Sequence, residues 1–139
     1  MNFRRVACLL AVCMMLLSSI CLAAEHMEFV DANGSTGYYV DVDTIAPETV
    51  VENDVPRTLW NADVAVVRAD INRRFIYAMR FDPDRKTYQI FHSEVQRYDT
   101  KDVLQSSDTV EAPHAYAPSS PMNEIVQFII STASSSAKE

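Results

Sequence analysis

The chain has 139 residues, of which 48% are hydrophobic and 22% are charged, and its formal net charge is −7. This length provides one domain and leaves no room for a two-domain enzyme. The acidic balance argues against binding to nucleic acid or to an anionic membrane surface through bulk electrostatics.

The first 24 residues predict a secretory signal peptide. Arg4 and Arg5 form a positive start, residues 6–20 are apolar except for two serines, and small residues follow at the end of the segment. Fifteen residues are fewer than the roughly 20 that a membrane-spanning helix needs. We expect cleavage after Ala24 and export to the periplasm, the cell surface or the medium. Lipidation at Cys21 is the less favoured alternative, because a bulky isoleucine precedes this cysteine.

Removal of this segment changes the chemistry that is left to the mature chain. All three cysteines lie within it, so the mature chain has neither a disulfide nor a thiolate metal ligand. The segment also carries two arginines and no acid, so the net charge becomes −9. Stability must then come from core packing, which a domain of this size can support.

Six segments predict β-strands from alternating or β-rich composition. In chain order they cover residues 27–32, 38–43, 49–51, 59–68, 75–81 and 88–98. Residues 33–37 hold both glycines and predict a turn, as residues 82–85 do around a proline. Prolines break residues 47–56, and the alternation of the last strand slips between Ile90 and Phe91, which indicates a bulge.

The alternation gives the predicted sheet one apolar and one polar face. The apolar face holds Tyr38, Val40, Val42, Trp60, Ala62, Val64, Val66, Phe75, Tyr77, Met79 and Phe81. The opposite face holds Tyr39, Asp41, Asp43, Asn61, Asp63, Arg74 and Arg80. An apolar sheet face needs a cover, so a further element must pack against it.

A C-terminal helix is the predicted cover. Residues 99–117 are polar and irregular, and then Ser120 is a typical N-cap that precedes a proline at the first helical position. Apolar residues follow at the spacing of one helix face, namely Met122, Ile125, Val126, Ile129 and Ile130. We expect the helix to end at 131–133, a single domain over 25–133 and a disordered tail over 134–139. The fold class is α+β, a small antiparallel β-sheet packed on one face by a C-terminal α-helix.

Catalytic and metal-binding patterns are weak in this sequence. No nucleophile stands beside a base in a known motif, and His26, His92 and His114 lie far apart. Asp41 and Asp43 could place two carboxylates on one strand face, but a solvated sheet face explains them better. We therefore expect no enzyme activity, no cofactor and no metal.

Four short segments of the sequence form a recognisable set. They are residues 38–45 (Tyr-Tyr-Val-Asp-x-Asp-Thr-Ile), the strand that begins at Leu59-Trp60, the hairpin with Tyr77 and Tyr88, and residues 117–120 (Ala-Pro-Ser-Ser) before the helix. In these segments the chain resembles the surface-adhesin protein E family. The resemblance implies a small antiparallel sheet with a C-terminal helix, and binding to host matrix or serum proteins. The chain lacks the tryptophan near the mature N-terminus and the cysteine pair that family members often carry.

These observations predict an exported non-enzymatic binding module that contacts host or envelope proteins in the manner of a surface adhesin. The alternative is a structural or accessory protein of the cell envelope without a host ligand. The expected partner is a protein with a basic patch rather than nucleic acid, and homo-oligomerisation stays open. The predicted contact residues lie on the polar sheet face, namely Tyr39, Asp41, Asp63, Arg74 and Arg80, because aromatic and arginine side chains dominate interfaces. Simple ion pairing between these acids and arginines is the competing interpretation.

Overall fold

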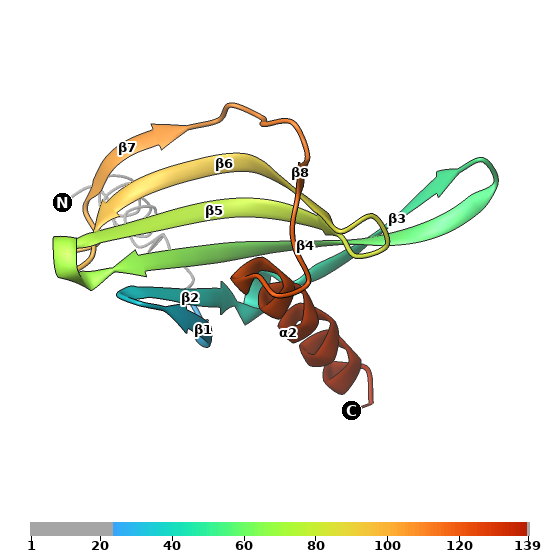
Figure 1. The fold of residues 1–139 in the computed structure, drawn as a ribbon, viewed down its shortest axis with the longest axis horizontal. Helices are drawn as coiled ribbons and strands as arrows, with labels where there is room; N and C mark the ends of the chain where they lie inside the picture. Colours follow the sequence, from blue (N-terminus) through green and yellow to red (C-terminus); the bar gives the residue numbers. More distant parts are fainter. Residues whose placement is uncertain (1–23, 139) are drawn as a thin grey trace, which may run out of the picture.

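The structure is a computed structural model and describes residues 24–138. These residues form an eight-stranded antiparallel sheet and one α-helix, α2 (Pro121–Ser136), as Figure 1 shows. The predicted α+β class, with its sheet and C-terminal helix, is confirmed. The expected signal peptide over residues 1–24 lies outside the described residues except for Ala24.

The sheet follows the spatial order β1-β2-β4-β5-β6-β7, with β3 paired to β4 and β8 paired to β6. Two short 3-10 turns, η1 (Val42–Thr44) and η2 (Ala69–Ile71), interrupt the strands. The strands are β1 (Met27–Asn33), β2 (Thr36–Asp41), β3 (Ala46–Glu52), β4 (Val55–Arg68), β5 (Arg73–Asp82), β6 (Thr87–Arg97), β7 (Val103–Ser107) and β8 (His114–Ala115).

The long strand β4 has two different neighbours on one edge. Its first half pairs with β3 and its second half with β2, while β5 pairs with the other edge only from Trp60 onward. The β3–β4 hairpin therefore extends past the rest of the sheet (Figure 1). At its tip Asn53 and Asp54 both have positive φ, the conformation of a type I′ turn. Both prolines are compatible with these strands. Each strand has an edge without a partner at that point, β3 at Pro47 and β4 at Pro56, so a missing backbone N–H need not remove a hydrogen bond of the sheet. The predicted short strand over 49–51 is thus confirmed as part of β3, whereas the expectation that prolines break residues 47–56 is wrong, because only the turn at Asn53 and Asp54 interrupts them.

The inner face of the sheet, which is the face that α2 covers, carries the core. Val40, Val64 and Phe81 are fully buried there, as the alternation predicts. The helix contributes Ile125 and Ile129, which are also fully buried, and it lies along β1 and β2 (Figure 1). Burying an isoleucine or phenylalanine side chain stabilises a fold by about 1.5–3 kcal/mol, so these contacts hold the two layers together.

The helix begins where the sequence predicts and ends later. The Ser120 hydroxyl accepts a hydrogen bond from the backbone N–H of Asn123 at 3.4 Å, with Pro121 at the first helical position. The helix continues to Ser136, so the expected end at 131–133 and the expected disorder of 134–136 are wrong. Serine hydroxyls in this last turn donate to carbonyls four residues earlier, for example from Ser134 to Ile130 at 2.8 Å.

The second strand ends earlier than predicted because of one side chain. The Asp41 carboxylate accepts from the backbone N–H of Asp43 at 3.1 Å and caps η1, so residues 42 and 43 leave the strand. The Thr44 hydroxyl donates to the carbonyl of Asp41 and accepts from the N–H of Asp63, each at 2.8 Å. These bonds satisfy the backbone at the point where β2 leaves β4.

Three further local predictions meet different outcomes. The bulge in β6 is confirmed, because Ala78 pairs with His92 and Met79 with Ile90, which leaves Phe91 as the extra residue. The predicted turn at 33–37 is too long, since only Gly34 has positive φ and Gly37 lies within β2. The expected irregular segment 99–117 instead contains β7 and β8, both paired to β6.

Candidate functional site

The outer face, which is the sheet face opposite α2, carries the predicted contact residues. Its central row crosses four strands through Tyr39, Ala65, Ile76 and Glu94. A second row contains Arg74, and a third contains Asp63 with Ala78 and His92. Arg80 lies one step further along β5, and Asp41 lies where β2 ends.

The five predicted residues fall into three groups rather than one patch. Tyr39 and Arg74 line a shared pocket, Asp63 lies in the middle where the charge of Asp41 raises its pKa, and Arg80 lines a second pocket at the β3–β4 hairpin.

The first of these pockets, the Tyr39 pocket, encloses about 260 Å³. Its walls come from the N-terminal segment, four strands and the turn after β6. The lining residues are Glu25, Met27, Tyr39, Val67, Arg74, Tyr98 and Lys101. The exposed ring of Phe29 meets the Tyr39 ring edge-to-face, with centroids 5.5 Å apart. Three aromatic side chains therefore lie at or beside this opening.

A glycine makes room for the Tyr39 ring. A Cβ atom added to Gly37 would lie 3.0 Å from Cε2 of Tyr39, closer than side-chain contacts normally allow. Gly37 does not have positive φ, so the space it leaves is what matters here, not its backbone freedom.

Arg74 forms the buried wall of the Tyr39 pocket. Only 4% of its surface is exposed, and its Nη2 donates to the Glu25 carboxylate. Lys101 Nζ lies 3.7 Å from the same carboxylate, and Arg74 Nη1 donates to the amide oxygen of Gln96 at 3.4 Å. Because its charge is paired, Arg74 positions Glu25 and is not itself an exposed anchor. Sequence reasoning missed Glu25, which is 49 positions away from its partner.

Asp63 is a carboxyl group in an unfavourable environment. Burial raises its pKa, the nearby charge of Asp41 raises it further, and the charge of His92 offsets part of this rise. Within residues 24–138 no hydrogen-bond donor reaches its carboxylate. Titratable groups held in this way are common in binding sites, since a ligand's charge can compensate for the burial.

His92, in the same row as Asp63, is surrounded by acids. Its Nδ1 lies 2.6 Å from Asp108 Oδ1 and its Nε2 lies 3.3 Å from Glu94 Oε1. Hydrogen bonds with these two carboxylates raise the pKa of His92. The sequence pattern did not place His92 on the outer face, because the β6 bulge next to it changes which face the following residues occupy.

The second pocket, the arginine pocket, lies beside the base of the β3–β4 hairpin and encloses about 340 Å³. The lining residues are Arg57, Leu59, Arg80, Asp82, Arg85, Thr87, Tyr88, Gln89 and Pro113. Arg80 donates from Nη1 to Glu48 at 3.2 Å, and its guanidinium lies 4.8 Å from the centroid of the Phe91 ring. Arg80 therefore forms an ion pair, as the competing interpretation expects. Its partner is Glu48, however, and not one of the predicted acids Asp41 and Asp63.

Two further kinds of feature are absent from the described part of the chain, a cluster of metal ligands and a membrane-spanning helix. Between residues 24 and 138, no three His, Cys, Asp or Glu side chains gather as a metal site would require. Over the same residues, no helix combines the length and the hydropathy needed to cross a membrane.

No protein-family model, curated protein or solved structure matches this chain. The resemblance to the surface-adhesin protein E family therefore rests on the short motifs alone. Adhesion to host proteins stays a prediction.

Proposed function

We propose that the chain is an exported, non-catalytic binding module that holds a protein partner on its outer face. The observation that carries the proposal is the composition of the Tyr39 pocket. Tyr39, Tyr98 and Met27 line it, and Phe29 lies beside it. Tyrosine, phenylalanine and methionine are enriched in protein interfaces. Tyrosine in particular buries a large contact area at a low entropy cost.

The size of the pocket favours a side chain as its occupant. Its volume of about 260 Å³ lies below the roughly 300–1,000 Å³ of typical small-molecule sites. One aromatic or long aliphatic side chain of a partner would fill it, with Tyr39 and Tyr98 as contacts.

The charges beside the pocket favour a basic partner. Asp63 and Asp41 lie on or at the edge of the same face, and the Asp63 carboxylate has no donor among the described residues. A lysine or arginine from the partner would neutralise this pair while a neighbouring side chain enters the Tyr39 pocket. Such complementarity contributes to specificity and association rate.

The test is capture of proteins from cell-envelope and matrix extracts by wild-type chain and by Tyr39→Ala. We expect Tyr39→Ala to weaken capture at least tenfold, since interface hot spots contribute about 2 kcal/mol or more. The control is Val110→Ala, which removes an exposed apolar side chain from the loop after β7, outside the Tyr39 pocket. Circular dichroism checks that both variants keep the wild-type fold.

Equal capture by wild type and Tyr39→Ala would reject the outer face as the binding surface. Failure of the wild-type chain to capture any protein would favour the alternative of an accessory envelope protein.

A further inference from the structure

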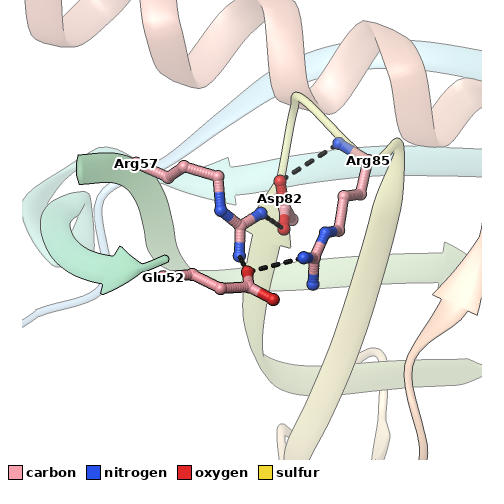
Figure 2. Close-up of polar contacts among 4 residues, drawn as sticks. All are labelled: Glu52, Arg57, Asp82 and Arg85. Atoms are coloured by element: carbon pink, nitrogen blue, oxygen red, sulfur yellow. Dashed lines mark hydrogen bonds and ion pairs between the residues drawn. The ribbon is translucent and has the colours of Figure 1, made fainter. Parts of the chain in front are cut away.

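The carboxylate of Glu52 occupies a position between two arginines. Glu52 is the last residue of β3, Arg57 lies in β4, and Arg85 lies in the turn between β5 and β6. The same oxygen, Oε2, accepts from Arg57 Nη2 at 2.8 Å and from Arg85 Nη2 at 2.5 Å (Figure 2). Two guanidinium groups that converge on one carboxylate oxygen form an oxyanion site.

Asp82 fixes the two arginines from the other side. Its Oδ2 accepts from Arg57 Nη1 at 2.5 Å, and its Oδ1 accepts from the backbone N–H of Arg85 at 3.1 Å (Figure 2). The side chain of Asp82 is 13% exposed, whereas that of Glu52 is 45% exposed. Asp82 is thus a fixed part of the site, and Glu52 is the carboxylate that can be exchanged.

Donor capacity remains after these contacts are made. Arg57 Nε is buried and has no hydrogen-bond acceptor within the described residues. A buried donor without an acceptor costs about 1–3 kcal/mol, so an incoming oxygen that reached it would be favoured.

The surroundings suit the rest of a small ligand. The arginine pocket, at about 340 Å³, lies within the size range of small-molecule sites. Leu59, Tyr88 and Pro113 supply apolar wall, and Arg80 adds a third guanidinium. Three of the 12 basic residues of an acidic chain thus line one pocket.

We propose that the arginine pocket binds an oxyanion of the carboxylate or phosphate type, with Arg57 and Arg85 as the donors. In the free protein the Glu52 carboxylate occupies the place of the ligand group. This site is separate from the Tyr39 pocket, and neither proposal depends on the other. The opposing explanation is that the four charged residues only hold the β3–β4 hairpin to the β5–β6 turn.

The two explanations differ in how added anions act. Inorganic phosphate and acetate are titrated separately, at constant ionic strength adjusted with sodium chloride, and amide chemical shifts are followed by NMR. We expect both anions to change the amide chemical shifts of residues 52, 57 and 85. We also expect Glu52→Gln to bind each anion about tenfold more tightly, because the substitution removes a competing negative charge. Binding of phosphate alone would identify phosphate groups as the ligand, and binding of acetate alone would identify carboxylates.

Two variants make the test specific. Asp54→Asn removes the same charge two residues away at the hairpin tip, where asparagine suits the positive φ, and should bind anions like wild type. Arg85→Gln, at a largely exposed position, should abolish binding in the Glu52→Gln background. The proposal is overturned if Glu52→Gln and Asp54→Asn bind alike, or if Arg85→Gln leaves binding unchanged while the amide spectra show an intact fold.

Discussion

Asp63 and His92 share a row of the outer face, and each has a pKa above the ordinary value of its residue type. The causes are different. Burial disfavours the charged form of Asp63, whereas hydrogen bonds with Asp108 and Glu94 favour the charged form of His92. Ionisation of Asp63 therefore costs the folded domain stability, and a cationic partner group that binds beside the carboxylate would reduce this cost.

Asp63→Asn should stabilise the free domain at pH 7. The folded-state pKa of Asp63 lies above its unfolded value, so its favourable contribution exists at acid pH and is lost as the pH rises through the folded-state pKa. The melting temperature of Asp63→Asn should exceed that of wild type at pH 7, and the difference should shrink toward about pH 4.

The control is Asp84→Asn, an exposed aspartate in the β5–β6 turn. It should change the melting temperature little across the same pH range. If the two variants gave the same pH profile, the carboxyl of Asp63 would be as well solvated as that of Asp84. The charge argument for a basic partner would then fail.

At the scale of elements, the domain depends on the docking of α2. Ile129 is fully buried against the inner face, whereas Gln127 lies on the exposed side of the same helix. Ile129→Asp loses about 1.5–3 kcal/mol of burial and adds the larger cost of a charge in the core. Because domains of this kind are stable by only about 5–15 kcal/mol, we expect Ile129→Asp to unfold or aggregate.

The control is Gln127→Asp, which introduces the same residue into the same turn of the helix. It shows how much of the loss of stability comes from the low helix propensity of aspartate alone. Its free energy of unfolding should lie within about 1 kcal/mol of the wild-type value, as for most surface substitutions. Urea unfolding followed by far-ultraviolet circular dichroism measures both variants. Similar midpoints would mean that the helix does not hold the sheet.

Sequence patterns correctly predicted those helices and strands that are determined by residues close together in the chain. The Ser120 cap, the apolar helix face and the alternation around Val64 and Phe81 depend on neighbours within a few residues. β7 was missed because Val103 and Leu104 are both exposed, so the strand has no buried face to reveal it. The early end of β2 was missed because the capping bond of Asp41 competes with strand alternation.

The sequence predicted which face of the sheet carries the candidate residues, but not which of them lie together in a pocket. Alternation placed Tyr39 and Arg74 on the outer face, and the structure puts them in one pocket. The burial of Arg74 and its pairing with Glu25 depend on contacts between distant segments, which periodicity does not encode. The arginine pocket was missed because the expected break over 47–56 concealed the hairpin that supplies Glu52 and Arg57.

For the whole molecule, net charge should control how binding depends on salt. The chain carries −7, and −9 without its first 24 residues, so a basic partner is attracted over a distance comparable to the Debye length. We expect affinity for a captured partner to fall about tenfold between 50 mM and 500 mM sodium chloride.

Surface plasmon resonance at several salt concentrations measures this dependence, and most of the change should lie in the association rate. The loss of affinity caused by Tyr39→Ala should stay constant with salt, because it reflects apolar contact. Affinity that rose with salt would contradict an acidic binding surface.

The anchoring of Glu25 has a practical consequence for handling this protein. Its carboxylate is held by Arg74 and lines the Tyr39 pocket, so any polypeptide joined before Glu25 leaves the domain at the rim of that pocket. A purification tag at that end would therefore start beside the opening and could block it. The last turn of α2 contributes no residue to the Tyr39 pocket and packs near Trp60 of the inner face, so tags and surface linkers belong at the C-terminal end.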